Sequence, residues 1–213
     1  MNEIEKLRNK RMGEKLIKNF SRRMFDAYYC ESSTDVQTLI KKIVPEQSTI
    51  TWGGSSSIFE TGVAQILKDG NYQVFDRADA KNADEKMAIY RKAFSCDYYL
   101  ASANAISEDG QIINIDGNGN RIAAITWGPR HVIFIVGINK VCKDIDSAMK
   151  RARNTAAPVN MTRFENLDTP CHKDGLCHDC LSPDSICNYF SVIRRSQPAH
   201  RHIVILVGEN LGY

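Results

Sequence analysis

Four of the seven cysteines lie within a short stretch near the C-terminus, CHKDGLCHDCLSPDSIC. Their spacing is Cys171-x5-Cys177-x2-Cys180-x6-Cys187. Four thiolates suit a tetrahedral zinc ion or a [4Fe-4S] cluster, because both take four cysteine ligands. His172 and His178 are alternative nitrogen ligands, which would favour zinc or a mixed site. Disulfides or free thiols are the remaining interpretations, although four free thiols in a polar loop would be open to oxidation.

The cellular compartment bears on the choice between metal and disulfide. The N-terminal stretch MNEIEKLRNKRMGEK is charged, and no stretch approaches the roughly 18 uncharged apolar residues of a membrane span. We therefore expect a cytoplasmic protein, whose thiols stay reduced and are more suited to a metal. The net charge of +3 is spread over both signs without a basic, aromatic-rich stripe, so nucleic acid is not an expected partner. Cys30, Cys96 and Cys142 are expected to be small buried hydrophobic residues.

A second group of residues is suited to binding an anion. In TITWGGSSSIFETG, two glycines follow a strand and three serines open a helix, so backbone N–H groups and hydroxyls converge at a positive helix end. The candidate ligand-binding residues are Gly53, Gly54, Ser55, Ser56 and Ser57. The alternative is a tight turn with an ordinary serine N-cap.

A third group combines amides, glycines and an arginine in SANAISEDGQIINIDGNGNRIA. EDGQ and DGNGN are hairpin-type signals, which predict a short ribbon that includes the stretch from Ile112 to Ile115. The candidate ligand-binding residues that this ribbon would bring to the sheet edge are Asn104, Asn114, Asn118, Asn120 and Arg121. Ordinary turn chemistry would also explain the asparagines and glycines.

The N-terminal residues 1–45 are expected to form a helical segment. Apolar residues recur at three- and four-residue steps, which predicts one helix extending to Tyr28 with Gly13 as a weak point. Its apolar face would contain Ile4, Leu7, Leu16, Ile17, Phe20, Met24, Phe25 and Tyr28. SSTDVQTLIKKIV predicts a second helix that begins near Asp35 and ends at Pro45.

Residues 46–213 alternate between strand, turn and helix patterns. STITWGG, YQVFD, DYYLAS, HVIFIVGI and HIVILVGE predict strands, and single helices are expected over SSSIFETGVAQILKDG, ADEKMAIYRKAF and DIDSAMKRARNTAA. HVIFIVGI is almost continuously apolar, which is typical of a strand covered on both faces. The alternation predicts an α/β domain with a mainly parallel sheet flanked by helices, and a cysteine-rich loop over residues 168–188.

Three segments together resemble the LUD domain family, whose members are associated with lactate utilization. These segments are TWGGSSSIFETG, SANAISEDGQIINIDGNGNRIAAITWGPRHVIFIVGINK and ILVGENLGY. The resemblance implies the fold shared by ribose-5-phosphate isomerase, glucosamine-6-phosphate deaminase and the family I coenzyme A transferases. It also implies membership of an iron–sulfur complex that oxidises L-lactate to pyruvate with partner subunits. This context favours a [4Fe-4S] cluster over zinc at the four cysteines.

One segment departs from the enzymes of that fold. Sugar-phosphate isomerases have Gly-Ala-Asp directly after a strand, where this chain has Ser102, Ala103 and Asn104. An amide cannot act as a general base, so isomerase chemistry by that route is not expected. Carboxylates from elsewhere that could take its place are Glu60, Glu108 and Asp116. Glu108 stands where a coenzyme A transferase would need its nucleophile, but its surroundings equally suit an exposed turn. His131 is expected to be a strand-end histidine.

The leading functional hypothesis is a component of an iron–sulfur system for L-lactate or related hydroxy-acid utilization, which binds an anionic small molecule at the carboxyl end of the sheet. One alternative is an independent enzyme that binds a sugar phosphate or a coenzyme A ester. A zinc-stabilised regulatory protein is another, and it needs no substrate.

Overall fold

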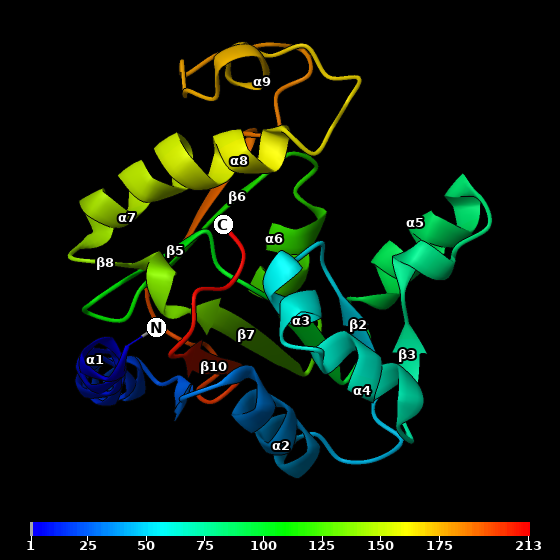
Figure 1. Ribbon diagram of the computed structural model, residues 1–213. Coiled ribbons are helices and arrows are strands. Elements are labelled where there is room, and N and C mark those ends of the chain that lie inside the picture. The colour runs from blue at the N-terminus through cyan, green and yellow to red at the C-terminus, as the bar shows by residue number, and fades with distance from the viewer. Residues whose placement is uncertain (1) are drawn as a thin grey trace.

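The computed structural model describes residues 2–213 and contains two β-sheets between layers of helices (Figure 1). All strand pairs of the larger sheet are parallel. Its strand order is β1 (Asp26–Cys30), β10 (His202–Val207), β7 (His131–Gly137), β4 (Tyr98–Ala101), β2 (Thr49–Trp52) and β3 (Gln73–Phe75). The smaller sheet has the order β8 (Val141–Cys142), β5 (Ala105–Ser107), β6 (Ile112–Asp116) and β9 (Tyr189–Ile193). The predicted α/β fold with a mainly parallel sheet is therefore confirmed.

The helices connect the strands and cover the sheets. They are α1 (Glu3–Arg22), α2 (Ser33–Ile43), α3 (Ser56–Glu60), α4 (Val63–Asp69), α5 (Ala83–Lys92), α6 (Asn120–Thr126), α7 (Ile145–Arg151), α8 (Ala157–Met161) and α9 (Pro170–Asp174). Short 3-10 turns occupy Arg77–Asp79 and Ile138–Lys140, and a π-helical turn, Ala152–Ala156, joins α7 to α8. Within residues 2–213, we find no helix with the length and apolar character needed to cross a membrane.

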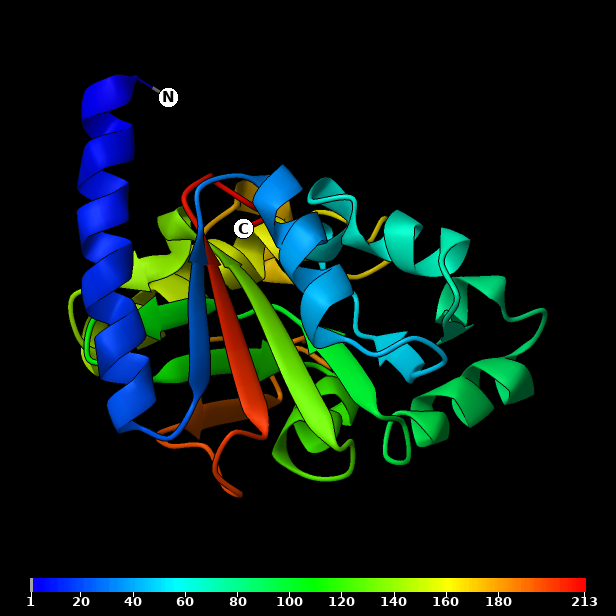
Figure 2. The same ribbon diagram turned by 90° about the horizontal axis from the view of Figure 1, so that it is seen from below.

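The core is built around β7, which lies between β10 and β4. Val132, Phe134 and Val136 pack with α1, α6 and the smaller sheet, whereas Ile133 and Ile135 pack on the opposite face with α2 and α4. In Figure 2, β1, β10 and β7 run side by side, with α1 along one edge. This two-sided burial explains the continuous apolar sequence of the strand.

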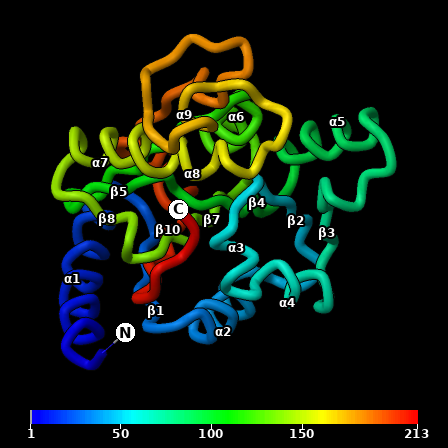
Figure 3. Tube along the Cα trace, turned by 45° about the horizontal axis from the view of Figure 1, so that its top comes forward, coloured from blue at the N-terminus to red at the C-terminus, as the bar shows by residue number. Residues whose placement is uncertain are grey.

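The smaller sheet lies between the main sheet and the α7–α8 layer. Ile106 and Ile112 join the core that contains β7, whereas Ile113 packs with Ala148 and Ala152 on the other side. The tube view shows α7 and α8 over this sheet, with the cysteine-rich segment beyond them (Figure 3).

The prediction of one N-terminal helix extending to Tyr28 is wrong, because α1 ends at Arg22. Met24 has a φ of 62°, and strand β1 follows and pairs with β10. Residues 1–45 therefore supply an edge strand of the main sheet as well as α1 and α2. Gly13 is a point of close packing, since a Cβ there would collide with the ring of Tyr29.

Two further expectations about local structure are corrected. DGNGN does not close a hairpin: Gly119 has a φ of 75° and starts α6, which carries Arg121. The single helix expected over residues 55–70 is divided by Gly62, with a φ of 70°, into α3 and α4. Glycine adopts these left-handed conformations without the steric penalty of a Cβ.

We predict that α1 is an integral part of the core. Phe20→Ala should lower the free energy of unfolding by about 3–5 kcal/mol, because the side chain is 1% exposed and packs edge-on against Phe25. Ile4→Ala is the matched control in the same helix, at a side chain that is 82% exposed, and should change it by less than about 0.5 kcal/mol. Urea unfolding measures both; equal effects would show that α1 contributes no core packing.

Candidate functional site

A pocket of about 670 Å³ lies at the carboxyl ends of three neighbouring parallel strands. Strand β2 leads through the two glycines to Ser57, β4 leads directly to Ser102, and β7 leads to Lys140. All three of these side chains line the pocket. Open parallel sheets present such crevices to ligands, because loops from adjacent strands converge there.

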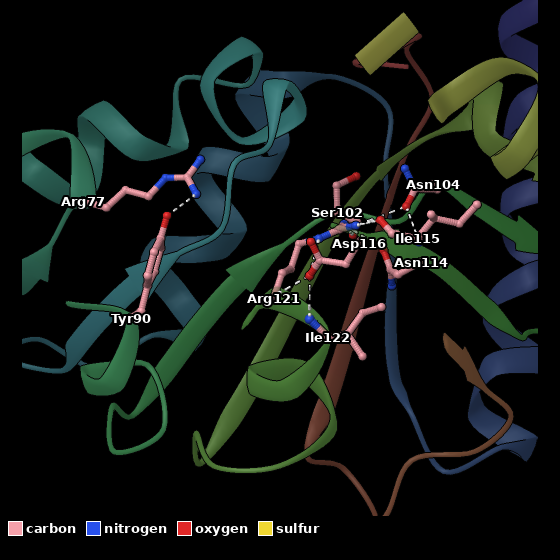
Figure 4. A network of polar contacts seen from close by, with 9 residues as sticks. All are labelled: Arg77, Tyr90, Ser102, Asn104, Asn114, Ile115, Asp116, Arg121 and Ile122. Atoms are coloured by element: carbon pink, nitrogen blue, oxygen red, sulfur yellow. Dashed lines mark hydrogen bonds and ion pairs between the residues drawn. The ribbon is translucent and has the colours of Figure 1, made fainter. Parts of the chain in front are cut away.

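Arg121 extends from α6 into the centre of a polar network (Figure 4). Its guanidinium donates hydrogen bonds to Asn114 Oδ1 at 2.9 Å, Asn104 Oδ1 at 3.2 Å and the Ile115 carbonyl at 2.6 Å. Asp116 accepts the backbone N–H groups of Arg121 and Ile122, which holds the first turn of α6. The amide partners that fix the guanidinium are neutral, and the carboxylate of Asp116 forms a longer ion pair with it, 4.0 Å from Arg121 Nε.

Basic side chains outnumber carboxylates in the pocket lining. The basic residues are Arg77, Lys86, Arg121, Lys140 and Arg163, and the acidic residues are Asp116 and Asp184. Arg77 donates to Tyr90 Oη, and its guanidinium reaches the backbone of Gly54 so closely that a Cβ there would collide with it. The excess of basic groups favours an anionic ligand.

Lys140 is 3% exposed, and its Nζ lies 3.1 Å from both Ser57 Oγ and Ser102 Oγ. The two hydroxyl oxygens are themselves 3.3 Å apart. Burial lowers the pKa of Lys140 to about 7, and the charges of Arg151 and Arg121 add to this effect. The charge of Glu60 acts to raise the pKa of Lys140. Lys140 therefore changes charge near neutral pH, unlike an ordinary lysine.

The serine-rich segment contributes hydroxyls rather than a long helix. Helix α3 has only five residues, so its dipole is small. Ser55 Oγ is buried and lacks a hydrogen-bond partner within residues 2–213, although Ser55 lines the pocket. A buried hydroxyl of this kind is free to bind a ligand.

The structure brings most of the predicted binding residues to this pocket. Those that line it are Gly54, Ser55, Ser56, Ser57, Asn104, Asn118, Asn120 and Arg121. Gly53 lines a smaller adjoining pocket together with Trp52, and Asn114 is fully buried and accepts a hydrogen bond from Arg121. Local sequence patterns thus identified two segments that meet in space.

The three candidate carboxylates are separated. Asp116 lines the pocket, and Glu60 accepts the Gly212 N–H at 2.7 Å. Glu108 lies outside the pocket lining and pairs with Lys143 at 3.1 Å. His131 begins β7, at the opposite end from the pocket, and stacks on Tyr98, as expected for a strand-end histidine.

The cysteine-rich loop forms one wall of the pocket. Pro183, Asp184, Ser185, Ile186 and Asn188 contribute to the lining. The Asn188 backbone N–H and side-chain amide donate to the carbonyls of Asp116 and Gly117, both at 3.1 Å. These two hydrogen bonds hold the wall against the end of β6, which precedes Arg121.

The four cysteines of the loop are half-buried thiols. The pKa of Cys187 is raised to about 11, mainly by burial and in addition by the charges of Cys171, Cys177 and Cys180. All seven cysteines are free, and within residues 2–213 no three His, Cys, Asp or Glu side chains are arranged to hold a metal ion. His178 instead pairs with Asp174 at 2.7 Å. The donor set nevertheless fits a four-thiolate site chemically.

The pocket residues that sequence analysis missed include Lys140, Arg77 and Arg163. Lys140 carries a recognisable signal, because it is a lone lysine directly after the apolar stretch HVIFIVGIN. Arg77 and Arg163 lie in polar segments whose approach to the pocket depends on the packing of distant elements. No local pattern distinguishes them from ordinary surface arginines.

Residues 13–207 match the LUD domain family. The chain belongs to this family. A DUF162 family protein from Deinococcus radiodurans, DUF162 being the former name of the LUD domain, has the same fold at 11% identity. The alignment has a TM-score of 0.51 and covers 95% of this chain and 97% of that one.

A weaker structural similarity is to eIF2B delta from Chaetomium thermophilum. It has 13% identity and a TM-score of 0.37, and covers 57% of this chain and 54% of that one. At this score the similarity carries no inference. No curated protein matches the chain. Membership of the LUD domain family supports a function related to lactate utilization in general terms.

We predict a pH dependence of stability that comes from Lys140. The unfolded chain keeps this lysine protonated up to about pH 10, whereas the folded chain releases the proton near 7, so stability rises with pH between these values. Relative to Lys140→Met, the wild type should gain at most about 1.4 kcal/mol per pH unit in this window. Urea unfolding from about pH 6 to about pH 9 measures the difference.

Lys143→Met is the matched control, because Lys143 is an exposed lysine three positions away. Its stability should follow that of the wild type at every pH. A constant difference between wild type and Lys140→Met across the range would contradict the assigned ionisation.

Proposed function

We propose that this LUD-domain protein is a component of an iron–sulfur system for the utilization of L-lactate or a related hydroxy acid, and that it binds the anionic substrate or product. The observation that carries the proposal is the basic, hydroxyl-rich pocket at the carboxyl ends of β2, β4 and β7. Family membership supplies the metabolic context.

The side chains of the pocket match the chemistry of a small hydroxy acid. Arg121 is held by two amides, and Arg77 extends toward Gly54 from another element, so a carboxylate has guanidinium groups available to it. Ser55 and the other serines offer hydroxyls to the substrate's hydroxyl or carbonyl oxygen. A pocket of about 670 Å³ also has room for acids larger than lactate.

The loop over residues 168–188 would hold the cluster through its four cysteines. A bound cluster would supply one-electron transfer beside the pocket wall that the same loop forms. The polypeptide's part is to bind and orient the anion, through Arg121 and the serines, and to limit its contact with water. A cluster could also serve only to hold this wall in place.

We expect the cysteine loop to determine both metal content and stability. Protein purified without oxygen should contain iron and acid-labile sulfide, and Cys177→Ala/Cys180→Ala should lose both because two of four ligands are missing. Its unfolding temperature should fall in proportion to the lost metal. Cys142→Ala, outside the loop and partly buried, is the control and should retain the metal.

The metal analysis distinguishes the alternatives. Zinc without sulfide would replace the cluster by a structural metal site, and the absence of any metal would contradict the metal-binding hypothesis. A double variant that stays equally stable but fails in electron transfer would assign the cluster a redox role rather than a structural one.

We predict that Arg77 contributes directly to anion affinity. Arg77→Gln should weaken L-lactate binding at least about tenfold, because a charged hydrogen bond contributes roughly 1.5–3 kcal/mol. Arg91→Ala is the control, since Arg91 lies on neighbouring α5 outside the pocket lining. Isothermal titration calorimetry measures both variants. Saturable binding of sugar phosphates or coenzyme A, without any for hydroxy acids, would favour the independent enzyme instead.

A further inference from the structure

Lys140, Ser57 and Ser102 form a compact triangle of polar atoms at the pocket wall. The three atoms come from the ends of β7, β2 and β4, and their separations are 3.1, 3.1 and 3.3 Å. Gly212 packs against two members of this triangle, since a Cβ there would be 2.9 Å from Ser57 Oγ and 3.3 Å from Lys140 Nζ. The amine is thus positioned by two hydroxyls and shielded by backbone.

The surroundings of Lys140 disfavour an ammonium group. No carboxylate within residues 2–213 forms an ion pair with it, and its hydrogen-bond partners are neutral hydroxyls. The charged groups that act on it are Arg151 from α7, Arg121 from α6 and Glu60 from α3, so two cations oppose one anion. Glu60 also accepts the Gly212 N–H.

A buried lysine without a counter-ion is costly, so packing alone does not explain it. Desolvation and neighbouring cations are the two conditions that keep a lysine amine uncharged and nucleophilic. Both are present here, and the lowered pKa of Lys140 agrees with them. The amine also lines a cavity with arginines suited to an acid.

We propose that Lys140 is a nucleophile that forms a Schiff base with the carbonyl carbon of a small 2-oxo acid bound in this pocket. The inference rests on the proposed function, because a 2-oxo acid is the product of oxidising a 2-hydroxy acid. It goes beyond that function by assigning a covalent step to a residue of this chain.

The step balances without an oxidant or reductant. The Lys140 lone pair attacks the carbonyl carbon, a C–N bond forms, and the carbonyl oxygen takes up a proton to give a carbinolamine. Loss of the second N–H proton and departure of the oxygen as water leave a C=N bond. Ser57 and Ser102 are placed to relay protons from nitrogen to the departing oxygen. Arg121 or Arg77 would hold the carboxylate.

Borohydride trapping with pyruvate tests the proposal. The wild type should gain one reduced pyruvyl adduct by intact-protein mass spectrometry, and peptide mapping should place it on Lys140. Lys140→Met should lose at least about nine tenths of the labelling, whereas Lys143→Met should retain it, because Lys143 is exposed and paired with Glu108. Ser57→Ala and Ser102→Ala should slow trapping, because each removes one hydroxyl from the relay.

Mapping on the wild type keeps the test valid even if Lys140→Met fails to fold. Labelling spread over surface lysines, or unchanged in Lys140→Met, would overturn the proposal. Calorimetry with pyruvate separates the two levels of inference: binding without trapping refutes the Schiff base alone. If pyruvate neither binds nor is trapped, the anion site is refuted as well. Trapping on Lys140 in protein without iron supports the Schiff base and removes the iron–sulfur part of the proposed function.

Discussion

The burial of β7 on both faces is the constraint on which the architecture depends. A strand with the sequence HVIFIVG has no face that can be left in water, so one set of side chains requires α2 and α4 and the other requires α1, α6 and the smaller sheet. Because β4 and β10 pair with it in parallel, their carboxyl ends are brought to the same edge. The pocket forms where the polar chain segments leave this edge.

The basic side chains at this edge of the sheet give the partly buried pocket a positive electrostatic potential. Asn104 and Asn114 accept hydrogen bonds from Arg121 without adding negative charge, and the carboxylate of Asp116 lies 4.0 Å from Arg121 Nε. An aspartate at position 104 would place a second carboxylate beside Arg121 and reduce the positive charge available to the proposed anion. Asparagine at this position therefore removes a general base and adds no negative charge to the proposed anion site.

The cysteine loop connects the possible metal site to the pocket. Asn188 bonds to the backbone around Gly117, and Asp184 and Ser185 face the cavity, so the loop serves as a wall as well as a carrier of thiols. Arg153, in the π-helical turn between α7 and α8, forms an ion pair with Asp179 and contacts Cys177. A change at the cysteines would therefore reach the pocket through few intervening residues.

The sequence by itself determined the α/β class, the buried strands and two segments that meet in the pocket, because hydrophobic period, glycine turns and capping residues act between near neighbours. It did not determine that the first helix ends at Arg22, that DGNGN starts α6, or that Glu108 lies apart from Asp116. Tertiary structure alone decided the charge state of Lys140, because its partners Ser57 and Ser102 are 83 and 38 positions away in the sequence. The physical reason is desolvation: the charge of an amine depends on what surrounds it in space, and that is fixed only when distant strands pack together.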